Sequence, residues 1–365
     1  MRIPKLATGA LAISLPSLSQ ASCSTRPSNQ NGNLTVAMVR CPPPNWPLPI
    51  LNFDWSGTVL NISQTVDKAI DLMNEASANG ADFVMFPELW FPGFPKGADG
   101  QWSMEFLPSY IENSLVVGDD NWNRLLDGIT SAGIYAQLNY AERTDDYLYM
   151  AQALVSPIGD VLIHRHKLRP SGTERAMFTD GTIGEIVTVN TAFGRLGLLE
   201  CGEHQYPSMT FPLQAQRENF HFGPFPYMVE ANNTDAAWWE GAFANMGTMG
   251  HYANLAGAYS FTTAVGVAFV MTPLAQLDAY MSDREDFDEF PMLYHSINTT
   301  SFDSSVTYDA NSQISWGTLM QIVNGFPSYI PRDEGDFVKW HSVNISDELS
   351  GTYNMSAPGA VGPVS

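Results

Sequence analysis

The stretch ISQTVDKAIDLMNEASANGADFVMFPE, residues 62–88, decides the fold class. Its apolar residues recur at the spacing of one helical face over residues 62–79, and Gly80 follows as a stop signal. DFVMFP, at 82–87, is a short apolar run typical of a buried strand. Because residues 34–40 (LTVAMVR) also favour a strand, the order strand–helix–strand predicts an α/β fold with a parallel or mixed sheet covered by helices.

The same alternation of apolar strands and amphipathic helices continues toward the C-terminus. No internal repeat or clean linker interrupts it, but the pattern weakens and becomes acidic after residue 280. We therefore expect one large domain over residues 34–280 and a divergent C-terminal extension over residues 281–365. Further strands are expected at 133–140, 148–155, 161–167, 185–189, 195–201 and 264–271, and helices at 119–132, 208–218 and 251–259.

Length and charge limit the classes of function. With 365 residues, of which 44% are hydrophobic, the chain can bury a large core without a structural metal or a disulfide framework. It carries 38 acidic residues against 17 basic ones, which is a formal net charge of −21. Such a surface repels phosphate backbones, so we expect no nucleic-acid partner, and solubility is the ordinary explanation of the acidity.

The first 21 residues have the pattern of a secretory signal peptide. Two basic residues precede an uncharged apolar run over residues 6–18, and Ala21 ends a stretch with small residues at the positions that a signal peptidase reads. The run is too short to span a bilayer. We expect residues 1–21 to be removed, residues 22–33 to form a flexible N-terminal segment, and the mature protein to be secreted without a membrane anchor.

Cysteines and glycosylation sequons agree with export. Cys23 and Cys41 lie close together near the expected mature N-terminus and are candidates for a disulfide. Cys201 remains, and an unpaired cysteine in an oxidising compartment is a liability unless it is buried or used. Asn-x-Ser/Thr sequons, the acceptors of N-linked glycans, lie at Asn33, Asn61, Asn232, Asn298, Asn344 and Asn354.

Three residues stand out as candidates for catalysis. Lys167 ends an apolar strand in a chain with only five lysines, and a cation beside a cysteine would lower the thiol pKa. Glu88 lies amid aromatic and apolar residues, where a carboxylate must find a partner or stay protonated. Cys201 follows a strand and precedes Gly202, in the kind of tight turn that presents a nucleophile. A basic surface patch, a capping carboxylate and an inert buried thiol are the ordinary alternatives.

The segments around these three residues resemble the nitrilase superfamily, and within it the nitrilase branch. Each segment alone is moderately specific, whereas their order and spacing together are strong. The resemblance covers roughly two thirds of the chain, over residues 34–275. The segments that carry it are GADFVMFPE (80–88), PGFP (92–95), YIENS (110–114), HKLRPSGTER (166–175), FGRLG (193–197) and CGEH (201–204).

The resemblance implies both an architecture and roles for four residues. It makes Glu88 the general base, Lys167 the cationic stabiliser and Cys201 the nucleophile of a Glu–Lys–Cys triad. Glu174 matches the family's supporting glutamate, which orients the lysine and the substrate. Residues 34–280 would form a four-layer α-β-β-α sandwich that assembles into a homo-oligomer and needs no metal or organic cofactor.

The expected activity is hydrolysis of a small-molecule nitrile to a carboxylic acid and ammonia by a nitrilase-type carbon–nitrogen hydrolase. The reaction would pass through a thioimidate and a thioester on Cys201. Three alternatives on the same fold stay open. They are an amidase, a nitrile or cyanide hydratase that releases the amide, and a catalytically silent binding protein.

The sequence departs from the family around the nucleophile. Gly202 stands where many nitrilases carry Trp, and Glu200 places a second carboxylate directly before Cys201. A carboxylate beside a thiolate would raise the thiol pKa, although strand alternation predicts that Glu200 points away. These differences bear on the choice of substrate more than on the triad.

Two rival sites use histidine. A Cys201–His204 dyad would leave the lysine and glutamate of the triad unexplained. His164 and His166 are two apart on an expected strand and so share a face, which is a possible start of a metal site. The sequence shows no third ligand for them, and metal sites in proteins take three or four.

Overall fold

The computed structural model describes residues 32–98, 100–302, 310–332 and 338–350. The expected signal peptide (1–21), Cys23 and Asn354 lie outside the described residues. Within these ranges, the helices are too short or too polar to cross a bilayer.

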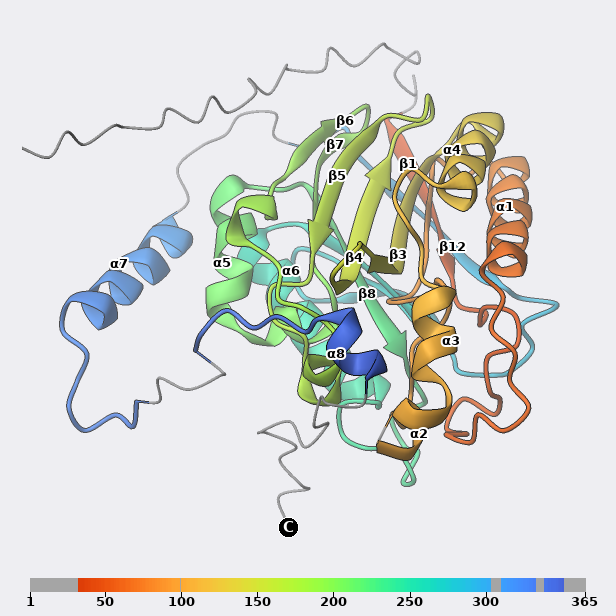
Figure 1. The fold of residues 1–365 in the computed structure, drawn as a ribbon. Coiled ribbons are helices and arrows are strands. Elements are labelled where there is room, and N and C mark those ends of the chain that lie inside the picture. The colour runs from red at the N-terminus through yellow and green to blue at the C-terminus, as the bar shows by residue number, and fades with distance from the viewer. Residues whose placement is uncertain (1–31, 99, 303–309, 333–337, 351–365) are drawn as a thin grey trace, which may run out of the picture.

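Two sheets of six strands each lie at the centre of the described molecule (Figure 1). Their orders are β12-β1-β2-β3-β4-β5 and β11-β10-β9-β8-β7-β6, and the middle strands β1-β2-β3 and β7-β8-β9 are parallel. The first sheet contains β1 (Asn33–Val39), β2 (Phe83–Met85), β3 (Tyr135–Arg143), β4 (Leu148–Val155), β5 (Val161–His166) and β12 (Met292–Asn298). The second contains β6 (Val189–Thr191), β7 (Gly194–Leu198), β8 (Phe220–Tyr227), β9 (Tyr259–Val265), β10 (Ala268–Met271) and β11 (Leu277–Met281).

Helices cover the outer faces of both sheets. Figure 1 shows α1 and α4 on the first sheet and α5 and α6 on the second. The α-helices are α1 (Ile62–Ala78), α2 (Gly100–Glu105), α3 (Leu107–Glu112), α4 (Asp120–Ala132), α5 (Pro207–Gln216), α6 (Ala242–Ala256), α7 (Ala310–Asn324) and α8 (Ile345–Leu349). Three short 3-10 helices are η1 (Gly172–Ala176), η2 (Ile183–Glu185) and η3 (Cys201–Gln205).

Strand β1 shows why this arrangement has four layers. Leu34, Val36 and Met38 face the second sheet in the core between the sheets, whereas Ala37 and Val39 pack in the core beneath the outer helices. A strand that is buried on both faces reads as a continuous apolar run, as the sequence does here. The result is the α-β-β-α sandwich that the resemblance implied.

Helix α1 begins and ends as its sequence indicates. The side chain of Asn61 accepts a hydrogen bond from the backbone N–H of Gln64, 3.1 Å away, which caps the first turn. After the last turn Gly80 adopts a φ of +81°, a conformation that glycine reaches without strain. Val66 and Met73, on the face of α1 that is turned toward the sheet, pack into the core between the outer helices and the first sheet.

The inner face of the first sheet changes from apolar to polar along β3. Tyr135 belongs to the apolar core between the sheets, whereas Gln137 and Asn139, farther along the same face, are fully buried amides. The Asn139 amide accepts a hydrogen bond from Gln137 at 2.6 Å and donates one to the carbonyl of Phe86. Glu88 follows Phe86 by two residues, so this layer of buried amides lies next to the expected site.

Three strands, β8, β11 and β12, lie where the sequence pattern predicted none. Strand β8 has the sequence FHFGPFPY, and its glycine and two prolines disfavour a strand by local propensity. It is nevertheless fully buried and parallel to both β7 and β9. Strand β12 comes from the segment assigned to the C-terminal extension, yet it pairs antiparallel with β1 and completes the edge of the first sheet.

Three predicted elements have other boundaries. The strand expected at 185–189 is the end of η2 followed by the short β6. The strand expected at 264–271 is interrupted at Gly266, whose φ of +105° turns β9 into β10. The helix expected at 251–259 is the last part of α6, which begins nine residues earlier at Ala242.

The C-terminal segment also packs back on the domain. Asp180 accepts a hydrogen bond from the backbone N–H of His341 at 2.8 Å, and its own carbonyl accepts one from the Trp340 indole at 3.0 Å. Asp180 also pairs with Arg169 and Arg175. Residues near the C-terminus therefore hold the loop that follows η1.

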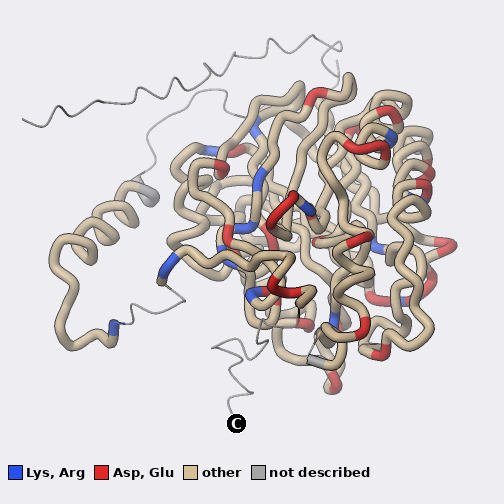
Figure 2. The backbone as a smooth tube through the Cα atoms, in the orientation of Figure 1, with Lys and Arg blue, Asp and Glu red and all other residues tan. Residues whose placement is uncertain are grey.

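The surface agrees with the charge of the sequence. Figure 2 shows Asp and Glu spread over the loops and helices, with few Lys and Arg among them. Of the described sequon asparagines, Asn344 is partly buried and caps α8, whereas four are exposed. The exposed ones are Asn33, Asn61, Asn232 and Asn298.

Asn61 has two separable functions, as helix cap and as expected glycan acceptor. In protein made without glycans, Asn61→Ala should lower the free energy of unfolding by about 1 kcal/mol, because the N–H of Gln64 loses its acceptor. Asn61→Asp removes the sequon but keeps a capping oxygen, so it should leave stability nearly unchanged. Urea unfolding of both variants measures the difference, and equal stability of the two would contradict the capping role.

Candidate active site

Three charged residues from different parts of the chain meet between the sheets. The Nζ of Lys167 lies 2.5 Å from Oε1 of Glu88 and 2.9 Å from Oε2 of Glu174. Lys167 is completely buried, and Glu88 and Glu174 are 1% and 8% exposed. The structure thus brings together three of the four residues that the sequence marked, and it pairs the ammonium with both carboxylates.

Backbone hydrogen bonds place the lysine and the first glutamate. Lys167 directly follows β5, its N–H donates to the carbonyl of Met150, and its carbonyl accepts from Gly181, both at 2.8 Å. Glu88 follows β2, and its N–H donates to the carbonyl of Phe225 on β8, 3.1 Å away. The glutamate is therefore attached to both sheets.

Glu174 is held in place by the capping interaction at the start of η1. It is the third residue of η1, and its Oε2 accepts the backbone N–H of Ser171 at 2.6 Å in a capping box. The same oxygen accepts the Lys167 ammonium. Its position is thereby set before any substrate binds.

Cys201 stands at the turn where β7 leads into η3. Its φ of +39° is uncommon for a residue with a side chain and marks a sharp change of chain direction. The thiol-bearing residue is partly buried. Gly202 leaves no room beside it, because a Cβ there would lie 2.9 Å from Oγ of Ser171. A larger residue at 202 would therefore require the hydroxyl of Ser171 to move aside.

A second buried ion pair joins this turn to β5. The guanidinium of Arg165 donates two hydrogen bonds to Glu203, at 2.6 and 2.9 Å, and both side chains are almost fully buried. Glu203 also accepts the backbone N–H groups of Leu168 and Glu200, each at 2.8 Å. Sequence patterns did not mark this pair, since a single Arg on a strand carries no signal of its partner.

The charges around Lys167 set its protonation. Burial acts to lower the pKa of the ammonium, but the carboxylates of Glu174 and Glu88 outweigh it and hold the pKa well above its usual value. Burial raises the pKa of Glu88, and the charge of Lys167 offsets this only in part. Oε2 of Glu88 has no hydrogen-bond partner among the described residues, so it is available to take a proton.

The pKa of the Cys201 thiol differs from the value that the sequence led us to expect. Burial and then the charge of Glu88 raise its pKa well above the usual value, and the opposing effect of Lys167 is smaller. The lysine therefore does not create a resting thiolate, contrary to that expectation. The thiol is neutral at rest and must give its proton to a base during attack.

Glu200 is the second unusual carboxyl group. It is completely buried, and neither of its side-chain oxygens has a hydrogen-bond partner in the described parts of the chain. Burial, followed by the charge of Glu88, raises its pKa well above the usual value. Burial of a carboxyl group in this setting favours its protonated, neutral form.

His204 is already engaged on both ring nitrogens. Nδ1 lies 2.8 Å from the carbonyl oxygen of Cys201, and Nε2 lies 2.9 Å from Nε2 of His221. Burial and the neighbouring His221 lower the pKa of His204 well below its usual value. The ring thus orients the backbone of the nucleophile, and the geometry disfavours a Cys201–His204 dyad.

Tyr110 is a candidate that sequence reasoning left without a role. It is completely buried, and its hydroxyl has no hydrogen-bond partner within the described ranges. Burial, and then the charges of Glu174 and Glu88, raise its pKa well above the usual value, so the hydroxyl keeps its proton. It can donate a hydrogen bond to a bound molecule. The only signal was its place in a segment that carried the family resemblance.

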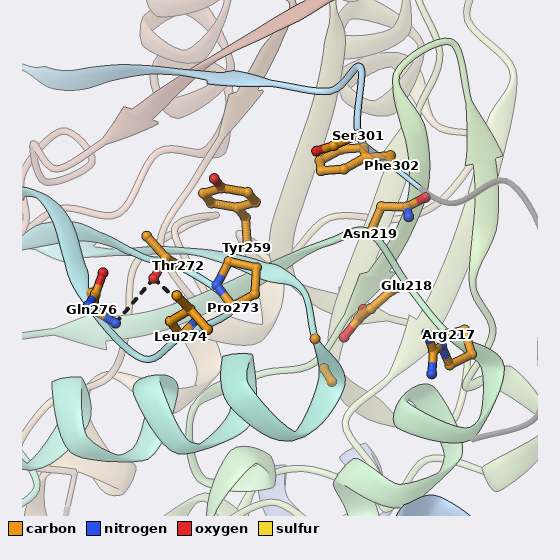
Figure 3. A pocket seen from close by; sticks show the side chains of 12 residues that line it. Arg217, Glu218, Asn219, Tyr259, Thr272, Pro273, Leu274, Gln276, Ser301 and Phe302 are labelled. Carbon is orange, nitrogen blue, oxygen red and sulfur yellow. Dashed lines mark hydrogen bonds between the residues drawn. The ribbon is translucent and has the colours of Figure 1, made fainter. Parts of the chain in front are cut away.

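A surface pocket lies away from this site (Figure 3). Asn219, which lines the pocket, directly precedes β8. Phe225, whose carbonyl accepts the N–H of Glu88, lies six residues farther along this strand, which is roughly 20 Å from Asn219. Glu218 in the pocket also bonds to His221 and Tyr252. The lining residues are Arg217, Glu218, Asn219, Ala256, Gly257, Tyr259, Thr272, Pro273, Leu274, Gln276, Ser301 and Phe302.

The chain is similar to curated nitrilases and to a cyanide hydratase. It is 35% identical over 191 residues to an aliphatic nitrilase from Rhodococcus rhodochrous, covering 48% of this chain and 50% of that protein. It is 32% identical over 232 residues to a nitrilase from Pseudomonas syringae pv. syringae, with 63% and 66% covered. It is 36% identical over 171 residues to a cyanide hydratase from Leptosphaeria maculans, with 46% and 48% covered. The matched segments thus span between 48% and 66% of the length of these relatives.

Solved structures agree on the fold. An amidase from Nesterenkonia sp. superimposes with a TM-score of 0.57 at 16% identity, covering 80% of this chain and 97% of the amidase. At this identity the likeness bears on the fold, and it confirms the predicted nitrilase-type α/β sandwich. Residues 35–276, which include every residue of the candidate site, match the carbon–nitrogen hydrolase family. The chain therefore belongs to this family, within the nitrilase superfamily that its sequence resembles.

Proposed function

We propose that the protein is a thiol hydrolase that converts a nitrile to a carboxylic acid and ammonia, with Cys201 as nucleophile, Glu88 as general base and Lys167 as cationic stabiliser. The observation that carries the proposal is the buried Glu88–Lys167–Glu174 group, whose charges act on the thiol of Cys201. The similarity to nitrilases supports the substrate class.

The first step joins the thiol to the nitrile carbon. The neutral thiol passes its proton to the unpartnered oxygen of Glu88 as sulfur adds to the carbon, and the carbon–nitrogen triple bond becomes a double bond. Lys167 stabilises the negative charge that develops on nitrogen, in a site from which water is largely excluded. Glu88 then passes the thiol proton to this nitrogen, which gives a thioimidate on Cys201 and restores the carboxylate.

Water then completes the hydrolysis. Glu88 takes a proton from a water molecule that adds to the thioimidate carbon, and the tetrahedral intermediate expels ammonia to leave a thioester. A second water cleaves the thioester, releases the carboxylic acid and restores the thiol. One nitrile and two waters thus give one acid and one ammonia.

A hydratase is the second candidate. If the tetrahedral intermediate expels the thiol of Cys201 in place of ammonia, the product is the amide and only one water is consumed. Similarity to a cyanide hydratase supports this alternative. Protonation at nitrogen favours loss of ammonia, and the buried cation Lys167 and the neutral carboxyl of Glu200 are the groups that bear on this choice.

We further propose that the protein is exported, glycosylated and assembled into a homo-oligomer. The apolar start of the chain and four exposed sequon asparagines support export. The exposed aromatic side chains of Trp238 and Phe243, which are 70% and 75% accessible, support a contact between copies near α6. A silent binding protein is the alternative, and the complete set of triad residues argues against it.

Substitution of the nucleophile is the direct test of the chemistry. Cys201→Ala should lower the release of ammonia from a panel of aliphatic and aromatic nitriles by at least ~10³-fold, because no covalent intermediate can form. Acid, amide and ammonia are quantified together, and we expect acid and ammonia in equal amounts from the wild type.

The matched control is Cys41→Ala, which removes a buried thiol outside the site and should keep the activity. Amide as the main product would make the protein a hydratase, and turnover of amides alone would make it an amidase. Full activity of Cys201→Ala would exclude the mechanism.

The base should also govern the pH profile. Glu88 acts as a carboxylate, a form that predominates above its pKa, and burial raises that pKa above the ordinary carboxyl value of about 4.3. We therefore expect kcat/KM to fall about tenfold per pH unit as the pH drops through the raised pKa.

Glu88→Gln should lose both the activity and this acid limb, whereas Glu75→Gln, on the exposed side of α1, should keep both. A rate that stays constant down to the ordinary carboxyl pKa would show that Glu88 is not the base.

Export is tested separately from catalysis. In protein secreted from its native host, we expect N-linked glycans on some of the exposed acceptors, because a sequon must be accessible to be modified. Mass spectrometry of peptides before and after enzymatic deglycosylation measures occupancy at each site. Bare asparagine at every sequon would count against the secretory route.

A further inference from the structure

A cluster of one carboxylate and two imidazoles lies on the outer face of the first sheet, outside the catalytic group. Strand β5 alternates, so Ile163 and Arg165 face inward while His164 and His166 face outward. Glu142, on β3, reaches toward both histidines and supplies the third group that the sequence pattern lacked. The β4 residues paired with the histidines are alanines, Ala153 and Ala151, which leave space above β4.

The distances in the cluster match a small coordination shell. Oε2 of Glu142 lies 2.6 Å from Nε2 of His164 and 3.3 Å from Nε2 of His166. In tetrahedral zinc sites, metal–ligand bonds of about 2.0–2.2 Å put neighbouring ligand atoms about 3.3 Å apart. The Glu142–His166 pair already has this spacing. His164 must move by less than about 1 Å, which its partly exposed side chain on an edge strand allows.

His166 is oriented as metal-bound histidines are. Its Nδ1 lies 3.3 Å from Oε2 of Glu185 in η2, and the same carboxylate oxygen accepts the backbone N–H of His166 at 2.7 Å. The ring of Tyr149 stacks on the imidazole at 4.1 Å. With Nδ1–H directed at Glu185, the lone pair of Nε2 faces Glu142 and His164, which is the carboxylate–histidine–metal arrangement.

A simple ion pair elsewhere in the chain provides the contrast. His295 and Asp278 lie 2.8 Å apart as one imidazole and one carboxylate. In the cluster, by contrast, two Nε2 atoms and one carboxylate oxygen converge on a common point, as the ligands of a single divalent cation do.

We propose that Glu142, His164 and His166 form a binding site for Zn²⁺ or a similar borderline divalent cation, with water as the fourth ligand. Two imidazoles and one carboxylate suit zinc, cobalt or nickel and do not suit magnesium or calcium, which take oxygen ligands. His166 directly precedes Lys167, so the ion would fix the end of β5 next to the site. This is a structural role, and it stands independently of the proposed catalytic function.

Zinc titration of chelator-treated full-length protein tests the site. All titrations use the Cys201→Ala background, because that thiol is itself a zinc ligand, and any affinity tag is removed. We expect one equivalent of Zn²⁺ per chain by calorimetry and a higher melting temperature in its presence. His164→Ala and Glu142→Gln should each weaken binding at least tenfold, and Glu185→Gln about tenfold through the orientation of His166.

The matched control is His295→Ala, which removes a partly buried imidazole that contacts a single carboxylate, and this variant should bind Zn²⁺ like its parent. Co²⁺ should give the visible absorption of a tetrahedral complex, and this absorption should be lost with His164→Ala. A hundredfold excess of Mg²⁺ should not displace zinc. Absence of stoichiometric binding, or binding that persists in both His164→Ala and Glu142→Gln, would overturn the proposal.

Discussion

The buried ion pair between Arg165 and Glu203 joins the two sheets beside the nucleophile, and the geometry of the site depends on it. Arg165 points inward from β5 of the first sheet, and Glu203 lies in the turn after β7 of the second. The carboxylate also holds the backbone at Leu168 and Glu200, one residue after Lys167 and one before Cys201. A pair this deeply buried is costly unless its polar atoms are hydrogen-bonded. Both oxygens of Glu203 are, whereas Nε of Arg165 has no partner among the described residues.

The interior next to this pair holds more carboxyl groups than cations. Lys167 is bound by two carboxylates, and the side chain of Glu200 is buried without a hydrogen-bond partner among the described residues. Burial then raises the pKa of Glu88, of Glu200 and of the thiol of Cys201 alike, so three acids with raised pKa values gather around one cation. Such a site is suited to passing protons between its groups during a reaction. It does not maintain a thiolate at rest.

Strand β5 serves three purposes through alternation alone. Its inward positions supply Ile163 to the core and Arg165 to the ion pair, and its outward positions supply His164 and His166 to the cluster with Glu142. The strand ends at the catalytic lysine. Any contact that fixes the end of β5, from either side of the sheet, therefore also bears on the position of the ammonium.

The sequence by itself determined the α/β class, the span of α1 and its stop at Gly80, because helical and strand periodicity and turn chemistry are local. Its resemblance to the nitrilase superfamily marked Glu88, Lys167 and Cys201 as candidates for the triad. It did not reveal β8 or β12, since the prolines of β8 oppose a strand locally and β12 is recognisable only by its pairing with β1. The Arg165–Glu203 pair, the third ligand Glu142 and the raised pKa of Cys201 were decided by tertiary structure alone. All three depend on burial and on contacts between groups far apart in the chain. The spacing of neighbouring residues encodes neither the burial nor these contacts.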